Sequence, residues 1–338
     1  MVHSFPTRRS SDLTVVSDFT GGGADTDWST TGNWDNGEPT TAAIALIGGG
    51  RTVALTASGE QAYDVIIGHN QAVSPGNGTL NQTGGSLAVA DRIVLGEGGA
   101  SGTYRMTAGT ATIADGVLDG GGTSTLQVDE GTMTISAGGL SVDTLRVGLM
   151  DNDNGTSTLT VLGGAVSVGT GGEILDVGRR PNVGIPTGKS HAATADFSAS
   201  SGVTIDVSQL RLGTIEGAPS GDSTVKGELK LSTSGTNSIT AGSILVSDSS
   251  DRGNIALSAI RLGSGSNTIA TDTFTLGGRK GAGEVTIASG GTLTLTGKSG
   301  AAVDLDLAMS VDGTGTTGTG NMNLVGGTFN ATIDVLNR

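Results

Sequence analysis

A short phrase that repeats with variations from about Gly78 to the end of the chain constrains the fold most. The phrase contains a short strand, a glycine turn, a second strand, a polar step and an aliphatic pair that closes on glycine. It is clearest in residues 78–96, and residues 157–178 keep the same skeleton with different polar residues. Self-similarity at such a period is typical of stacked supersecondary units and not of a closed globule.

The aliphatic-glycine closures recur at intervals of 24 to 35 residues, with Ser247 standing in one glycine position, and fall at Gly68, Gly96, Gly120, Gly148, Gly178, Gly213, Ser247 and Gly277. Within each unit, apolar residues alternate with polar ones, as in Thr292–Thr296. Period two predicts strands with one buried face. Three such strands and their corners use most of one period, so the sequence predicts an all-β chain folded as a right-handed parallel β-helix.

The composition agrees with a narrow core. The chain has 60 glycines and only 3% aromatic residues, so we expect Val, Leu, Ile, Ala and Thr to fill the interior. Disorder is the alternative for a glycine-rich chain. We disfavour it because 35% hydrophobic residues in frequent alternation are not the signature of a disordered segment.

These patterns divide the chain into three segments. Residues 1–13 resemble the in-frame translation of a sequencing adapter, so Arg8 and Arg9 are not interpreted as an export signal. Residues 14–53 hold both tryptophans and are predicted to form an N-terminal capping module. Residues 54–338 are predicted to be β-helix repeats truncated at the C-terminus, because residues 333–336 begin a closure without its turn. We therefore expect the natural termini to lie outside this sequence.

Trp28 and Trp34 are predicted to act as a hydrophobic lid, since a solenoid needs a cap over its terminal turn. The alternative is that an exposed indole stacks on a sugar. The segment around them, with Asn33, Gly37 and Pro39 ahead of the aliphatic run 42–47, resembles the opening module of bacterial surface β-helix proteins.

From that module onward, the chain resembles autotransporter-passenger-like repeat proteins, many of which end in a PEP-CTERM sorting tail. The repeats that carry this resemblance include residues 266–277 and the Val-x-Val strands that follow Gly-Gly turns. The resemblance implies a secreted or surface-displayed repeat protein. This sequence contains neither a sorting tail nor an outer-membrane barrel, so the mode of surface attachment stays open.

The net charge and the composition limit the classes of partner and of chemistry that this chain can have. A net charge of −14 disfavours nucleic acid phosphates and anionic lipid. The chain has no cysteine, which excludes a disulfide scaffold and cysteine catalysis. No apolar run approaches the roughly 20 residues of a membrane helix, so membrane insertion is not expected within this sequence.

Catalysis on a β-helix needs carboxylates that converge in one cleft. The candidates stand alone beside strands or turns, and a solvated outer face is the simpler interpretation; they are Asp115, Asp119, Asp129, Glu130, Asp143, Asp176, Asp206 and Asp304. We therefore assign no catalytic, cofactor-binding or metal-binding residue.

One histidine and three loop segments are further candidates for function. His69 is predicted to be a turn residue, distant from His191 and from any nucleophile elbow. The irregular stretch Arg179 to Ala193, which includes Lys189, is the best position for a ligand contact, because long loops on repeat scaffolds often carry function. Two acidic glycine loops, residues 21–27 and 151–155, could bind calcium, but Asx-rich turns explain both.

Together these patterns predict an extracellular structural or adhesive repeat protein, the stalk or passenger of a bacterial surface protein, with no catalysis. Its expected partners are glycans, extracellular matrix or other cell-surface proteins. The alternative is a polysaccharide-active β-helix enzyme, a lyase or glycoside hydrolase, or a carbohydrate-binding module. The sequence leaves the ligand and the oligomeric state open.

Overall fold

The computed structural model describes residues 15–71, 74–149, 154–181, 188–216, 224–248, 256–279, 281–308 and 318–337. These residues form 28 strands and one short 3₁₀ turn, η1 (Thr31–Asn33), with no α-helix. Within them no helix is long and apolar enough to cross a bilayer. The predicted adapter segment 1–13 lies outside the described residues.

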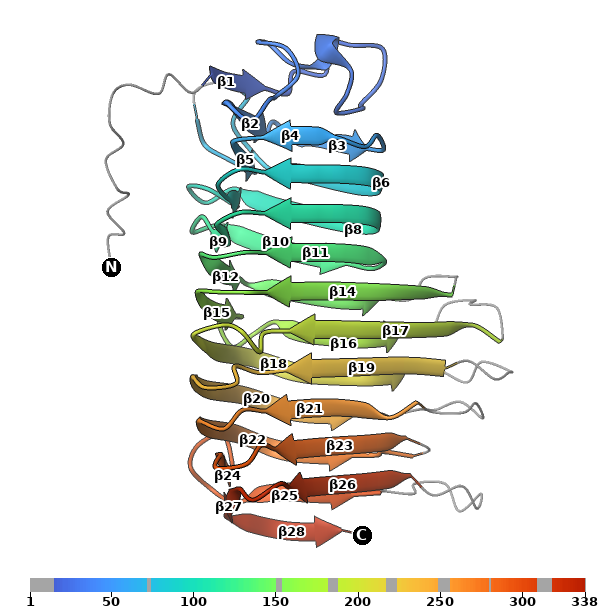
Figure 1. Cartoon of the computed structure of the whole chain (residues 1–338), viewed down its shortest axis with the longest axis vertical. Coiled ribbons are helices and arrows are strands. Elements are labelled where there is room, and N and C mark those ends of the chain that lie inside the picture. The colour runs from blue at the N-terminus through green and yellow to red at the C-terminus, as the bar shows by residue number, and fades with distance from the viewer. Residues whose placement is uncertain are drawn as a thin grey trace.

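The strands stack along one long axis from the N-terminal to the C-terminal end (Figure 1). β1 pairs in parallel with β2, and each strand from β2 to β25 pairs in parallel with strands two or three later in the chain, which yields three ladders. The first ladder contains β1 (Val15–Asp18), β2 (Ala43–Ile47), β5 (Asp64–Ile67), β7 (Ile93–Leu95), β9 (Gly116–Asp119), β12 (Gly139–Val142), β15 (Ala165–Val168), the first parts of β18 (Gly202–Ile215), β20 (Thr236–Val246) and β22 (Ser266–Leu276), then β24 (Thr292–Thr296) and β27 (Thr328–Ala331).

The second ladder contains β3 (Arg51–Leu55), the first parts of β6 (Gly78–Val89) and β8 (Ser101–Ile113), β10 (Thr123–Val128), β13 (Thr144–Leu149), β16 (Ile174–Arg180), the second parts of β18, β20 and β22, then β25 (Val303–Leu307) and β28 (Ile333–Asn337). The third contains β4 (Glu60–Ala62), the second parts of β6 and β8, β11 (Gly131–Ile135), β14 (Gly155–Val161), β17 (Ser190–Asp196), β19 (Thr224–Lys230), β21 (Ser258–Leu262), β23 (Ala282–Ile287) and β26 (Thr319–Leu324).

The inward side chains of all three ladders form one continuous apolar core that reaches from Phe19 to Leu305. The predicted inward register of one repeat is confirmed, since Leu87, Val89, Ile93 and Leu95 are all buried, whereas Thr83 is exposed. Parallel pairing throughout means that each turn buries its inner face only against its neighbours, as repeat architectures do. The chain is therefore nearly all β, with one long parallel sheet wound around a narrow core.

The corner that carries the long connection changes partway along the chain. Before β12, the long connections join the first ladder to the second, and β6 and β8 bend without a break from the second ladder to the third. After β13, the long connections join the second ladder to the third, and β18, β20 and β22 bend from the first ladder to the second. The change occurs where Asp143 alone separates β12 from β13.

The predicted closures are therefore not one equivalent series. Gly68, Gly96 and Gly120 follow first-ladder strands, whereas Gly148 and the later closures lie near the C-terminal ends of second-ladder strands. In the later set the backbone is left-handed at every position, and Ser247 adopts it with a φ of 60°. Its place among these glycines is confirmed by the pairing of Val246 with Leu276. A corner with positive φ explains why glycine dominates there.

The N-terminal segment folds its aromatic residues inward. Trp28 and Trp34 are 0% and 4% exposed, and their ring centroids lie 4.9 Å apart in an edge-to-face arrangement. Phe19 packs against Trp34 at 5.1 Å. All three belong to the same core cluster as the strands, so neither indole presents an open face on which a sugar could stack.

Candidate functional site

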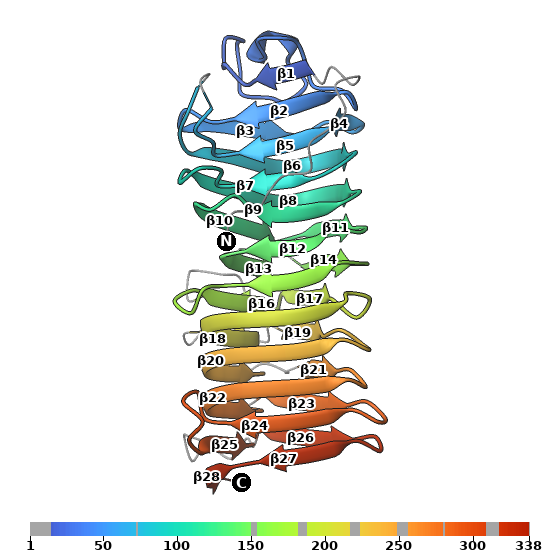
Figure 2. The same ribbon diagram turned by 90° about the vertical axis from the view of Figure 1, so that its left-hand side faces the viewer.

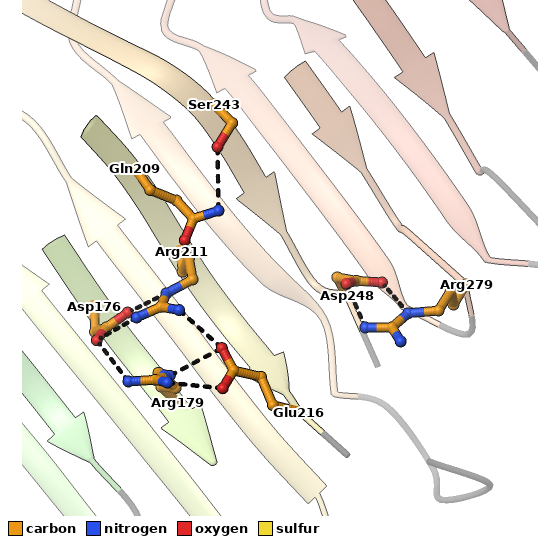
Figure 3. A network of polar contacts seen from close by, with 8 residues as sticks. All are labelled: Asp176, Arg179, Gln209, Arg211, Glu216, Ser243, Asp248 and Arg279. Atoms are coloured by element: carbon orange, nitrogen blue, oxygen red, sulfur yellow. Dashed lines mark hydrogen bonds and ion pairs between the residues drawn. The ribbon is translucent and has the colours of Figure 1, made fainter. Parts of the chain in front are cut away.

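A network of charged side chains lies on the outer side of the second ladder, next to the stretch that the sequence singled out (Figure 3). Asp176 of β16 pairs in register with Arg211 of β18. Arg211 holds the carboxylate with two bonds, Nε to Oδ1 at 2.6 Å and an Nη atom to Oδ2 at 3.0 Å. Arg179 contacts the same carboxylate at 3.5 Å. Asp176 is fully buried, and paired guanidinium groups are what makes such burial of a carboxylate tolerable.

Glu216 closes this network into a ring. It accepts hydrogen bonds from Arg179 at 2.7 and 3.2 Å and from Arg211 at 2.8 Å. Burial acts to raise the pKa of Glu216, but the hydrogen bonds and positive charges of the arginines outweigh it and lower that pKa below its usual value. Burial acts to lower the pKa of Arg179, but the hydrogen bonds and negative charges of Glu216 and Asp176 outweigh it and raise that pKa. Both groups stay ionised across the physiological range.

A second pair extends the network toward the C-terminal end. Arg279, in left-handed backbone at φ 49°, donates from Nε and Nη2 to the two carboxylate oxygens of Asp248 at 2.8 and 2.6 Å (Figure 3). Each arginine drawn there faces a carboxylate, so the region is electrically balanced. The network stabilises neighbouring turns, and Arg179 has no spare charge for an anionic ligand.

The stretch Arg179 to Ala193 is more regular than predicted. β16 runs through Arg180, and β17 begins at Ser190. Arg180 is 1% exposed, so its side chain is buried. Residues 182–187 of the proposed ligand-contact stretch lie outside the described residues.

The structure brings His191 next to a serine that sequence spacing did not connect with it. Nε2 of His191 lies 2.8 Å from Oγ of Ser157 in the preceding turn. Ser157 donates its hydroxyl proton to the carbonyl oxygen of Asp129, so His191 must donate to Ser157. A serine nucleophile needs the opposite direction of donation. Both side chains are buried, and burial lowers the pKa of His191. The pair therefore fits a structural contact.

His69 is buried, although a polar turn residue was predicted. It is 0% exposed and follows β5, and the buried Asp18 lies in β1, two strands earlier in the first ladder. The backbone of His69 forms an antiparallel bridge with Gly76, and its Nε2 lies against Gly48 of the preceding turn. Burial lowers the pKa of His69 and raises that of Asp18. At Asp18, burial outweighs the hydrogen bond of Ser74 and the charge of His69, which act in the opposite direction on its pKa. Burial therefore favours the neutral form of both side chains.

A pocket of ≈ 560 Å³ lies on the outer side of the first ladder in the N-terminal half. Aliphatic residues from three successive turns line it in register, namely Ile66, Val94 and Leu118. Its charged lining residues are Asp64, Arg92, Glu97 and Asp119. Apolar walls with a few polar groups are typical of small-ligand sites, and this composition suits a hydroxylated or cationic ligand.

The other candidate carboxylates do not gather. Asp129 binds Arg105 and Gln127, and Asp143 accepts from the backbone N–H of Ser124. Over the described ranges, no three His, Asp or Glu side chains are placed to share a metal ion. In the loop 21–27, Asp25 and Asp27 accept hydrogen bonds from nearby N–H and hydroxyl groups, as in Asx turns. Residues 151–153 of the other acidic loop lie outside the described part.

One carboxyl pair was missed by the sequence interpretation. Glu60 of β4 is 6% exposed, and its pKa is raised to about 8, first by burial and then by the hydrogen bond and negative charge of Glu38. The two residues are 22 positions apart and follow no motif, so only the docking of the N-terminal segment on the first turns reveals the pair.

No family model, no curated protein and no solved structure matches this chain, so its function is inferred from the geometry alone.

Proposed function

We propose that this chain is a section of an extracellular, right-handed parallel β-helix that serves a bacterial surface as a rigid stalk or adhesive passenger. The observation that supports this proposal is the single core that runs without interruption through three parallel ladders along one axis. In such a stack the interfaces between neighbouring turns add up, and length is gained without a second core. A rod of this kind holds exposed groups at a fixed distance from its point of attachment.

Adhesion on such a rod would come from repeated, shallow contacts. Outward residues of successive turns lie in register, and linked weak contacts gain avidity without any single deep pocket. Glycans, matrix components and proteins of neighbouring cells are the partners we propose.

The test compares the binding of single free chains with the binding of many chains coupled to one bead. The purified chain is measured against a glycan array, matrix proteins and whole bacterial cells, first free and then coupled at high density to beads. We expect strand-dominated circular dichroism, weak binding of the free chain and firm retention of the beads. Equal affinity in both formats would contradict the adhesive role, because avidity requires that linkage increases retention.

The pocket beside Ile66, Val94 and Leu118 favours a second candidate, a carbohydrate-binding module or a polysaccharide-active enzyme. Glu97 and Asp119 both line it. A saturable reaction on pectin, alginate or another polysaccharide that is lost in Asp119→Asn, but not in the distant Asp304→Asn, would establish this candidate and displace the stalk. Unchanged binding and no turnover in both variants would remove it.

A further inference from the structure

The outward residues of the first ladder form a periodic hydroxyl column in the C-terminal half of the chain. Ladder pairing aligns them one per turn in the order Ser167, Thr204, Ser238, Thr268 and Thr294. Each alternates with core residues such as Val203, Ile239 and Leu295, so the hydroxyl side faces away from the core. In the N-terminal half the same column is aliphatic, with Ile66, Val94 and Leu118.

Flanking columns extend this hydroxyl column into a two-dimensional array. Three successive strands carry hydroxyl residues at alternate positions, namely Thr236, Ser238 and Thr240 on β20, Ser266 and Thr268 on β22, and Thr292, Thr294 and Thr296 on β24. Neighbouring strands lie about 4.8 Å apart and alternate residues about 6.6 Å apart along a strand. We call these eight residues the hydroxyl array.

The array contains no charged residue, and its hydroxyl groups are accessible to solvent. All eight side chains are exposed or half-buried, and none of them takes part in a hydrogen bond recorded for the described residues. Lys, Arg, Asp and Glu are absent from 236–240, 266–270 and 292–296 in a chain whose net charge is −14. A neutral face on an acidic protein fits an uncharged partner.

The backbone behind the array is held in place. Asn237 and Asn267, each 1% exposed, stack on the inner side of β20 and β22, and Asn237 Nδ2 donates to Asn267 Oδ1 at 2.7 Å. Asn267 also donates to the carbonyl oxygen of Thr292 at 2.9 Å. In the C-terminal half the long connections join the second ladder to the third. The first-ladder strands of this half face the viewer in Figure 2.

We propose that the hydroxyl array binds the surface of ice. A hydroxyl carries one donor and two acceptor lone pairs, so a fixed array of hydroxyls can take the place of water oxygens at the edge of a lattice. A partner that matches repeats in two directions must itself be periodic in two directions. A crystalline polysaccharide is less suited, because residues 236–240, 266–270 and 292–296 include no aromatic side chain that could offer the stacking surface that sugars use.

The experiment measures ice shaping and thermal hysteresis of the full chain, with Thr268→Tyr at the centre of the array and Thr273→Tyr on the second ladder as the matched control. Thr273 is an exposed residue of the same strand, β22, and pairs with Ser243 and the charged Asp304. We expect the unaltered chain to facet ice crystals, Thr268→Tyr to lose this activity and Thr273→Tyr to keep it. Thr268→Ser should retain activity, because the hydroxyl remains.

Circular dichroism and proteolysis of each variant confirm that the fold persists. Absence of ice shaping by the unaltered chain would overturn the proposal, as would equal effects of the two tyrosines. Sedimentation with crystalline cellulose or chitin is measured in parallel. Binding there that depends on Thr268, without an effect on ice, would assign the array to a polysaccharide surface. The proposal does not depend on the stalk role.

Discussion

The indole Nε1 of Trp34 donates a hydrogen bond of 2.7 Å to the carbonyl oxygen of Trp28, and the two rings meet edge to face. The tryptophans of this chain are thus joined by a polar and an apolar contact inside the core. The N-terminal segment is fixed to the first turns by buried aromatic area, to which edge-to-face pairs add specific geometry.

Replacing Trp34 by Ala should destabilise the N-terminal turns by about 3–5 kcal/mol, because a large buried ring is lost and a cavity remains. Trp34→Phe should cost less, since it keeps ring volume but leaves the Trp28 carbonyl without its donor. Urea denaturation followed by circular dichroism measures both. The exposed Thr31→Ala is the control, and a loss there equal to that of Trp34→Ala would argue against this packing.

Leu95→Asp should disrupt the turn that contains β7, because Leu95 is 0% exposed and an unpaired charge in the core is costly. Thr83→Asp should be mild, since that side chain is exposed. Limited proteolysis compares the two variants. Equal resistance to cleavage would show that the register is not as described.

The Glu38–Glu60 pair should make stability fall as pH rises. The folded pKa of Glu60 is about 8 against a usual value of 4.5, so the folded state holds a proton that the unfolded state releases. This contribution is complete below about pH 4.5 and is lost as pH rises through about 8. Melting temperatures at pH 5, 7 and 9 should decline more in the unaltered chain than in Glu60→Gln. Parallel profiles would exclude the pair as the cause.

Arg211→Met should destabilise the chain by about 3–5 kcal/mol, because Asp176 remains buried without its bidentate partner. Adding Asp176→Leu should recover much of the loss, as a buried ion pair replaced by apolar side chains is often tolerated. Thermal unfolding of the single and double variants gives the comparison. A double variant as unstable as the single one would indicate that the network orders the turns in some other way.

Local pattern was enough to predict the strands and their inward residues. Alternation placed Leu87 and Leu95 in the core because a strand has period two, and glycine marked the corners because it accepts positive φ. The phrase did not reveal which corner each glycine occupies. That depends on which corner carries the long connection, and this changes at Asp143 between β12 and β13.

The contacts between neighbouring turns could not be predicted from the sequence. Asp176 and Arg211 are 35 residues apart, and Ser157 and His191 are 34 apart. Because the repeat length varies from turn to turn, no fixed spacing identifies such pairs. The burial of His69 was missed for the same reason, since its Nε2 lies against Gly48 of the preceding turn.

The direction of the ladders has a mechanical consequence. Hydrogen bonds between parallel strands connect one turn to the next, so they lie along the long axis of the rod. Tension between the ends therefore acts on these bonds lengthwise, and each boundary between turns carries the full load in series. The force that the rod withstands is set by its weakest boundary. Additional turns would extend its reach and leave its tensile strength unchanged.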